Sequence, residues 1–444
     1  MSDAPAPRGD ARTVWSWALY DFANSAFTTL VITFVYATYF VRGIAADETS
    51  GTALWSLGVV VPTAIVVALL SPLLGALADS TGTRKRALLI CTVVAVGGTV
   101  LLFFPQRGDV VLAITLVVVA NIAFEMAQVF YNAFLPEIAP ADRIGRISGW
   151  GWALGYVGGL LCMALALGLV LPEVAPFGLD KETGEHVRVT NLLVAGWFAL
   201  FSIPAFLYLR EPKPEAPPEA GLVRKTFGEL RETFRDIRNY RQIVRLLVAR
   251  MIYNDGLVTI FAMGGIFAAT AYGFTESEIL FFGIVLNVAA GLGAFVFGSL
   301  DDRLGGKTTI FISLGILVVA TVVAVLGPTK AWLWGAGVLI GIAAGPNQAA
   351  SRSLLGRFVP HDKETEFYGF FAFSGKATAF AGPALFGLMT TWFGTQRAGV
   401  AAVLGLFAIG VNVTVLNGRG VSFRVADVSW RGSDALEVDT ETDT

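Results

Sequence analysis

Six ionisable side chains lie inside stretches of sequence that are otherwise apolar enough to cross a membrane. They are three acids and three bases, namely Asp21, Glu125, Asp255, Arg250, Arg352 and Lys376. A charge inside the hydrocarbon region of a bilayer is costly, so each of these residues is a candidate for binding a substrate or an ion. Because the acids and the bases are equal in number, every charge could have a partner of opposite sign. We expect Arg250 to extend to the membrane surface. For Arg352 the sequence does not decide between the membrane surface and the site.

Polar uncharged residues accompany these charges. Glu125, Gln128 and Asn132 are spaced to share one face of a helix, and a Ser-Gly pair before Lys376 predicts a flexible segment. Gly345-Pro346 predicts a break or bend in its helix. The pattern predicts a hydrated central cavity; the alternative is that polar contacts only join helices. The predicted substrate or coupling-ion residues are Asp21, Asn24, Glu125, Gln128, Asn132, Asn254, Asp255, Asn347, Gln348 and Lys376.

A short polar turn occurs twice, each time between two apolar stretches. The aspartate of each copy falls at the C-terminal end of a predicted helix, where the helix dipole disfavours an anion. It therefore needs a partner, either a basic residue in the same turn or the N-terminus of an adjacent helix, and either would join two helices. The alternative is an ordinary charged loop. The predicted conformational latch comprises Gly75, Asp79, Gly82 and Arg84 in the first copy and Gly298, Asp302, Arg303, Gly305 and Lys307 in the second.

The composition is that of an integral membrane protein. Of 444 residues, 55% are hydrophobic and 15% are charged, against about 25% charged in soluble domains. With about 20 residues per crossing, the chain is expected to be an all-α polytopic protein with twelve transmembrane helices. The predicted spans are 15–40, 53–77, 86–104, 110–134, 147–171, 190–209, 243–270, 277–300, 307–327, 331–355, 366–392 and 396–417.

The two halves of the chain resemble each other beyond the repeated turn. Pro140 and Gly149 align with Pro360 and Gly369 at a constant offset. Such similarity indicates parallel repeats around a central cavity. The predicted organisation is an N-terminal segment (1–14), a six-helix bundle (15–209), a linker with an amphipathic helix (210–242), a second six-helix bundle (243–417) and a disordered tail (418–444).

Basic residues indicate the orientation in the membrane. Of the 32 lysines and arginines, 23 fall on the side of the N-terminus when the predicted loops are assigned, six fall on the opposite side and three lie in spans. Because lysine and arginine are enriched in cytoplasmic loops, both termini are predicted to be cytoplasmic. The first apolar stretch is too long for a signal peptide and is expected to remain in the protein.

Motifs of enzymes and of metal or nucleotide binding are absent from the sequence. There is no Gly-x-x-x-x-Gly-Lys-Ser/Thr loop, so direct use of ATP is not expected. The two histidines, His186 and His361, lie in predicted loops without metal-ligand spacing. Cys91 and Cys162 lie in apolar stretches. We therefore predict that the chain is not an enzyme and has no metal, no cofactor and no nucleic-acid partner.

The repeated turn resembles the loop motif of the major facilitator superfamily, between spans 2 and 3 and again between spans 8 and 9. One departure is Ser80 in the place of the usual arginine, which Arg303 fills in the second copy. Residues 17–27 (WALYDFANSAF) and 373–383 (FSGKATAFAGP) resemble signatures of the branch of autophagy-related vacuolar amino-acid effluxers and their bacterial relatives. The resemblance implies two six-helix bundles that rock about a central site, in the plasma (inner) membrane of a bacterium.

These observations predict a secondary transporter of a small zwitterion such as an amino acid. Lys376 would face its carboxylate, and Glu125 or Asp255 its amine. Proton coupling would need one of these acids to take up a proton when unpaired; uniport is left open. The expected partners are a small-molecule substrate, protons and the lipid bilayer, with the protein a monomer. The alternatives are a drug or sugar exporter of the same fold and a non-transporting membrane receptor.

Overall fold

The computed structural model describes residues 8–172, 176–211, 228, 230–233, 235 and 240–416, which form helices and turns with no β-strand among them. The first half contains α1 (Ala11–Ala26), η1 (Phe27–Phe34), α2 (Tyr36–Tyr39), η2 (Phe40–Ile44), α3 (Glu48–Trp55), η3 (Ser56–Val60), α4 (Val61–Thr81), α5 (Arg84–Leu101), α6 (Val110–Ala133), α7 (Leu135–Ile138), α8 (Ile144–Val170), η4 (Pro176–Gly178) and α9 (Glu185–Tyr208). The second half contains α11 (Arg241–Tyr272), α12 (Glu276–Leu304), α13 (Gly306–Leu326), α14 (Lys330–Gly356), α15 (Glu364–Lys376), α16 (Ala381–Phe393) and α17 (Gln396–Leu416).

Every one of the twelve spans predicted from the sequence is occupied by helix. Within the described residues, nine continuous helical stretches are long and apolar enough to cross a membrane, the first being 11–44 and the second 48–81. The other three predicted spans correspond to α5, α14 and the pair α15 and α16. The predicted amphipathic helix of the linker lies largely outside the described residues, and the predicted disordered tail lies outside them entirely.

Two predicted helix interruptions have different outcomes. The sequence predicts a break or a bend at Gly345-Pro346; the break is wrong, because α14 continues through Pro346, and the bend stays a prediction. Membrane helices tolerate proline where neighbouring helices support the backbone, and α12 packs so closely here that a Cβ on Gly345 would lie 2.1 Å from the Ala290 carbonyl oxygen. The flexible segment predicted at Lys376 coincides with a real interruption: α15 ends at Lys376, and four residues separate it from α16.

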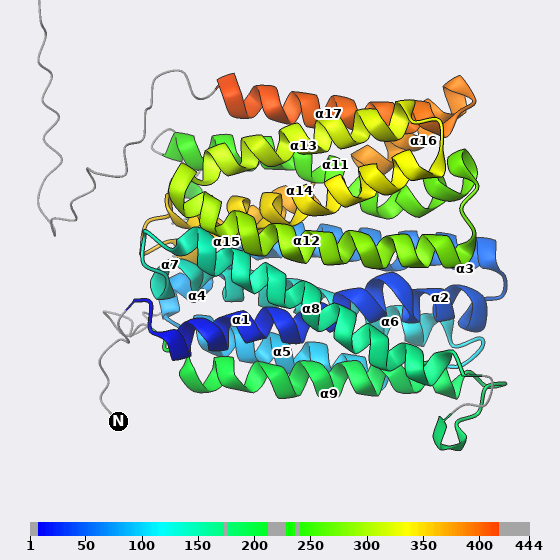
Figure 1. Cartoon of the computed structure of the whole chain (residues 1–444). Helices are drawn as coiled ribbons and strands as arrows, with labels where there is room; N and C mark the ends of the chain where they lie inside the picture. Colours follow the sequence, from blue (N-terminus) through cyan, green and yellow to red (C-terminus); the bar gives the residue numbers. More distant parts are fainter. Residues whose placement is uncertain are drawn as a thin grey trace, which may run out of the picture.

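The long helices lie side by side along a common axis, and each half of the chain forms its own bundle (Figure 1). The bundles meet where α8 packs against α12 and α4 packs against α15. We name the end of the molecule at which α4 and α12 terminate the motif end. Gly82 and Gly305 turn the chain there with positive φ angles of 61° and 84°, a conformation that glycine adopts without steric cost.

Glycines allow the two bundles to touch through their backbones near the motif end. A Cβ on Gly75 of α4 would lie 2.3 Å from the carbonyl oxygen of Thr365 in α15. At the equivalent contact, a Cβ on Gly149 of α8 would lie 2.9 Å from the Cα of Gly298 in α12. Small residues permit this approach, and van der Waals packing drives helix association in lipid. The repeated glycines are therefore the contact points of the two bundles.

Gly75→Ala is expected to destabilise the protein, whereas Gly97→Ala is not. The new Cβ at position 75 would overlap α15, and overpacking of this kind costs about 1–3 kcal/mol. Gly97 is exposed on α5, and a Cβ there would meet no atom of another described element within 4 Å. Thermal unfolding of both purified variants in detergent measures the difference, and equal melting temperatures would contradict the packing account.

Candidate functional site

The first copy of the repeated turn joins the two bundles through Asp79. This residue lies in the last turn of α4 and accepts hydrogen bonds from the backbone amides of Thr365 (3.1 Å) and Glu366 (2.8 Å) in the first turn of α15. Arg84, the first residue of α5, donates to Asp79 at 3.0 Å. Free amides and the positive dipole end make a helix N-terminus a favourable site for a carboxylate. Asp79 therefore has both kinds of partner that its position requires.

Arg84 lies among several buried carboxylates at this contact. Besides Asp79, it pairs with Glu137 of α7 at 2.8 Å and with Glu364 of α15 at 3.0 Å. Its Nε donates to the Thr365 hydroxyl at 2.7 Å. The departure at Ser80 therefore leaves an extensive ionic contact in the first half, because the arginine of α5 supplies the positive charge.

The second copy repeats this geometry with the halves exchanged. Asp302, near the end of α12, accepts hydrogen bonds from the backbone amides of Gly145 (2.7 Å) and Arg146 (3.0 Å) in the first turn of α8. Arg357, which follows α14, pairs with Asp301 at 2.7 Å and with Asp302 at 3.4 Å. Each half therefore contributes one aspartate and receives one at a helix N-terminus.

Two residues predicted for the latch take no part in the ion pairs that the described residues form at the second turn. Arg303 is exposed, and neither Arg303 nor Lys307 forms an ion pair with a described residue. Arg357 provides the charge instead, since it approaches Asp301 and Asp302 from another helix. Sequence reasoning missed Arg357, and it also missed the acids that surround Arg84, because charged residues in predicted loops gave no signal of burial.

A buried ion pair joins the bundles further in from the motif end. The Nη1 atom of Arg352 (α14) lies 3.0 Å from the Oδ2 atom of Asp21 (α1), and their side chains are 4% and 10% exposed. Arg352 also donates to Asn132 Oδ1 at 3.1 Å and to the hydroxyl and carbonyl oxygens of Ser148 at 3.0 and 2.8 Å. Arg352 thus belongs to the interior. Ser148 was not predicted from the sequence.

Three aromatic rings lie around the guanidinium of this buried pair. The guanidinium carbon of Arg352 lies 4.8 Å from the ring centre of Trp17, 5.8 Å from that of Tyr131 and 5.7 Å from that of Trp152. Cations are attracted to such ring faces, and the attraction is larger where water is excluded. Gly151 leaves room for the pair, because a Cβ there would lie 2.7 Å from the Asp21 carboxylate.

A second ion pair joins the bundles deeper in the molecule. The Nζ atom of Lys376 (α15) lies 2.6 Å from the Oε1 atom of Glu125 (α6). At 1.5 Å per residue, Lys376 lies about 18 Å along α15 from its first residue, whereas Arg352 lies about 6 Å from the end of α14. The side chains of Glu125 and Lys376 are 19% and 31% exposed. This pair is therefore both deeper and more accessible than the Asp21–Arg352 pair.

The prediction that Arg250 extends to the membrane surface is wrong. Arg250 is 8% exposed and lies between α11 and α15. Its Nη1 atom donates to the Phe371 carbonyl oxygen at 2.8 Å and to the Ser374 hydroxyl at 3.0 Å. Its guanidinium carbon lies 3.7 Å from the centre of the Phe371 ring. The last turns of α15 therefore hold the side chain inside the bundle.

Asn254 and Asp255, two predicted site residues that are adjacent in α11, have different surroundings. Asn254 lies beside the second ion pair, because its Nδ2 atom donates to the Gly375 carbonyl oxygen at 3.3 Å. Asp255 instead lies against α16, where a Cβ on Gly382 would come within 3.0 Å of its Oδ1 atom. That oxygen is buried and accepts no hydrogen bond from a described residue. Asp255 is thus separate from Lys376.

The other predicted amides also differ in their surroundings. Asn347 is buried and donates to Ser313 of α13 at 3.0 Å, inside the second bundle. The Nδ2 atom of Asn24 is buried without a described acceptor. Gln128 and Gln348 are partly exposed. The structure therefore assembles two central clusters, one of Asp21, Asn132, Ser148 and Arg352, the other of Glu125, Arg250, Asn254 and Lys376.

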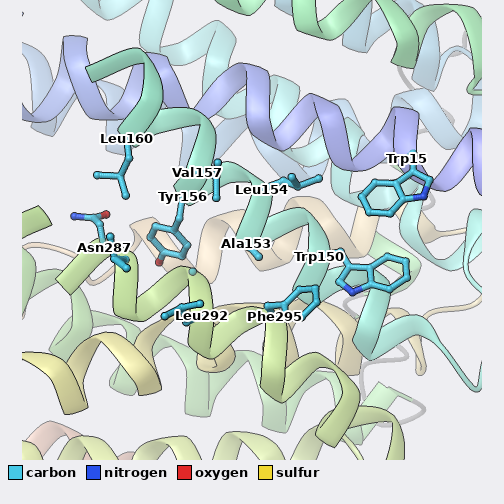
Figure 2. A pocket seen from close by; sticks show the side chains of 12 residues that line it. Trp15, Trp150, Ala153, Leu154, Tyr156, Val157, Leu160, Asn287, Leu292 and Phe295 are labelled. Carbon is cyan, nitrogen blue, oxygen red and sulfur yellow. The ribbon is translucent and has the colours of Figure 1, made fainter. Parts of the chain in front are cut away.

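A cavity of about 290 Å³ lies between α1, α8 and α12 and has an apolar lining. Trp15 and Trp150 stack at one end with ring centres 5.3 Å apart, and Asn287 lies at the other end (Figure 2). None of the charged residues of the two central clusters lines it. This cavity suits an apolar chain better than a polar solute, so it does not mark the site of the paired charges.

The fold and the cross-half contacts define a class of protein. The chain is similar in structure to the human organic anion transporter MFSD10, with a TM-score of 0.72 and 12% identity over 92% of this chain and 100% of that one. It is also similar to FucP in the outward conformation, with a TM-score of 0.70 and 12% identity over 92% and 98% of the two chains. At this level of identity, the likeness shows that the chain has the major facilitator fold.

Sequence comparison identifies the family within this class. The family described as "Vacuole effluxer Atg22 like" matches residues 43–145 and 138–418, so the chain belongs to the Atg22-like family. The chain is 29% identical to the MFS-type transporter YxiO of Bacillus subtilis (strain 168), over 94% of this chain and 97% of that protein. It is 25% identical to autophagy-related protein 22-1 of Aspergillus fumigatus over 57% of this chain, which spans 44% of the fungal protein.

Removing one partner of the buried Asp21–Arg352 pair is expected to destabilise the protein more than removing both partners. Arg352→Gln leaves Asp21 charged and buried without its partner, which costs about 3–5 kcal/mol. In the double variant Asp21→Asn/Arg352→Gln no uncompensated charge remains, so part of the stability should return. Thermal unfolding of the two single variants and the double variant measures this coupling. Additive losses would show that the pair is not energetically coupled.

Proposed function

We propose that this transporter carries a small zwitterionic solute, such as an amino acid, by alternating access, with Lys376 binding the carboxylate and Glu125 binding the amine. The observation that carries the proposal is the 2.6 Å ion pair between these residues. Breaking a buried pair normally leaves an uncompensated charge. A zwitterion carries both charges of the pair, so it can replace each partner and leave neither residue unpaired.

The surroundings of the two candidate acids support Glu125 as the amine-binding residue. Asp255, the alternative from the sequence, lies against the first turn of α16. Glu125 contacts Lys376 directly. Lys376 is also the last residue of α15, immediately before the interruption. Interrupted helices at mid-membrane depth are common at transporter binding sites, where the local backbone can adjust to a ligand.

The positions of the latches support a coupling between binding and movement. Asp79 and Asp302 each hold a helix of the opposite half at the motif end. We propose that these latches close the motif end in one state and that the end opens in the other. A ligand shifts such an equilibrium only through different affinity for the two states. Because the Glu125–Lys376 pair joins both halves, a solute that replaces it changes the cross-half contacts directly.

The proposed orientation places the motif end and both termini in the cytoplasm, with the protein in the plasma membrane of a bacterium. The support is the excess of lysine and arginine in the loops predicted on that side. We further propose that the two halves form bundles at 15–209 and 243–417 and that the protein acts as a monomer. Proton coupling is part of the proposal, since Glu125 can take up a proton when a solute or a movement removes Lys376.

Export of apolar drugs is a second candidate, favoured by the apolar cavity between α1, α8 and α12. Its lining would suit a hydrophobic solute. The deeper centre of the molecule, however, contains Glu125, Lys376 and Arg250. Burial of these charges would be an unnecessary cost for a carrier of uncharged compounds. The charged centre therefore favours the zwitterion.

Lys376→Ala is expected to lower amino-acid uptake into proteoliposomes at least about tenfold, because the solute carboxylate would lose a charge-assisted hydrogen bond. Uptake of a pool of labelled amino acids is measured with and without an imposed pH gradient. Lys330→Ala is the matched control, since Lys330 pairs with Glu278 and is 41% exposed. If the native protein, shown to be folded, moves no amino acid under either condition, the proposed substrate is wrong.

Asp79→Asn is expected to open the motif end more often, because a neutral amide interacts less favourably with a helix N-terminus than a carboxylate does. The measurement is the rate at which a water-soluble maleimide labels Ser71→Cys in a background without native cysteines. Ser71 is fully buried between α4 and α15, so labelling reports opening there. An increase of about tenfold corresponds to about 1.4 kcal/mol.

Asp47→Asn provides the control for this latch experiment. Asp47 is an exposed residue that caps α3, away from the contact between α4 and α15. Its substitution should leave the labelling rate of the cysteine at position 71 unchanged. Equal rates in the native, Asp79→Asn and Asp47→Asn backgrounds would contradict the latch role of Asp79.

A further inference from the structure

Arg250 is a buried cation whose guanidinium donates hydrogen bonds to neutral groups of α15. Within the described residues, no carboxylate lies within the 4 Å that defines an ion pair with its guanidinium. Nη1 uses its two N–H groups on the Phe371 carbonyl oxygen and the Ser374 hydroxyl. Nε is buried and donates to no described acceptor, and no hydrogen bond from Nη2 to a described residue is formed. An unpaired cation at this depth is costly, so the free donors require an explanation.

The unused donors have the geometry that recognises a carboxylate. The Nε and Nη2 atoms of a guanidinium present two parallel N–H groups, which match the two oxygens of a carboxylate. A cation that only supported the end of α15 would need the contacts of Nη1 alone. Nε is shielded from solvent in this state. A carboxylate therefore reaches this edge only after a rearrangement of the residues around it. The last turns of α15, which hold Nη1, directly precede the interruption after Lys376.

This free edge belongs to the same cluster as the Glu125–Lys376 pair. A Cβ on Gly375 would lie 2.7 Å from Nη1 and 3.2 Å from Nη2 of Arg250, and Lys376 is the next residue. The cluster thus contains two cations and one carboxylate. A neutral zwitterion bound between Glu125 and Lys376 would bring one positive and one negative charge, which oppose the charges of these two residues. The positive charge of Arg250 would still be uncompensated.

We propose that Arg250 binds a second carboxylate of the solute, so that the substrate is an acidic amino acid with two carboxylates and one amine. This inference rests on the proposed function and specifies its substrate class. Lys376 and Arg250 each bind one carboxylate, and Glu125 binds the amine. Three charges of the protein are then opposed by three charges of the solute, and the excess positive charge of the cluster disappears.

The experiment compares uptake of labelled L-glutamate and L-glutamine, which have similar size and differ in one carboxylate. Native protein in proteoliposomes should take up glutamate at least about tenfold faster than glutamine. Arg250→Gln should remove most of this preference while glutamine uptake remains. Arg241→Gln is the matched control, because Arg241 is an exposed arginine at the first position of α11. Arg250→Lys keeps the charge without the planar fork and should retain part of the preference.

Several outcomes would overturn the inference. Glutamine uptake without glutamate uptake by the native protein overturns the acidic substrate but leaves the zwitterion proposal intact, whereas uptake of neither overturns both. An equal loss of both uptakes in Arg250→Gln would show that Arg250 only supports α15. If that variant does not fold, the comparison of native protein with Arg250→Lys decides, and an unchanged preference in Arg250→Lys overturns the second-carboxylate site.

Discussion

The pairing of carboxylates with helix N-termini across the two halves is the interaction on which the rest of this structure depends. Asp79 binds the first-turn amides of α15, and Asp302 binds those of α8. Each aspartate is disfavoured by the dipole of the helix that it ends and favoured by the dipole of the helix that it touches. The contact is therefore stable only while the two halves are together. Glycine backbones in the same layers allow the helices to approach closely enough.

Deeper in the molecule, ion pairs between side chains join the two halves in place of these dipole contacts. In both pairs the acid comes from one half and the base from the other. The first half contributes the carboxylates Asp21 and Glu125, while the second half contributes Arg352 and Lys376. In this structure each of these charges is paired with a residue of the opposite half. The dry, aromatic environment of Asp21 and Arg352 suits a permanent contact of one conformation. The more exposed pair suits exchange with a solute, which is why we assign the substrate to Glu125 and Lys376.

Membership of the Atg22-like family and the major facilitator fold agree with this division of roles. The fold supplies two helical bundles that share an interface, and in our proposal the solute depends on the side chains at that interface. In this chain the cluster at the C-terminal end of α15, formed by Glu125, Arg250 and Lys376, carries one more positive than negative charge. A substrate class can be proposed from that imbalance, because buried charge has to be compensated by the protein or by its ligand.

The sequence by itself determined the class of the protein, the twelve helical spans and the doubled architecture, because long apolar stretches have few alternatives to helix in a bilayer. It also singled out every charged residue of the two central pairs, since a charge in an apolar stretch is conspicuous. Arg84, Asp79 and Asp302 were readable for another reason, because the polar turn that contains them occurs twice.

Only the tertiary structure decided which charges are partners, because an ion pair depends on distance and its members can be hundreds of residues apart. Asp21 lies with Arg352, and Glu125 with Lys376, across the two halves. The place of Arg250 in its own helix predicted that its side chain extends to the membrane surface. That prediction was wrong because the carbonyl and hydroxyl groups that hold the side chain inside come from α15. For the same reason Arg357, and not Lys307, forms the ion pairs with Asp301 and Asp302. Local sequence reveals where a charge is costly, but the packing of distant helices determines what compensates it.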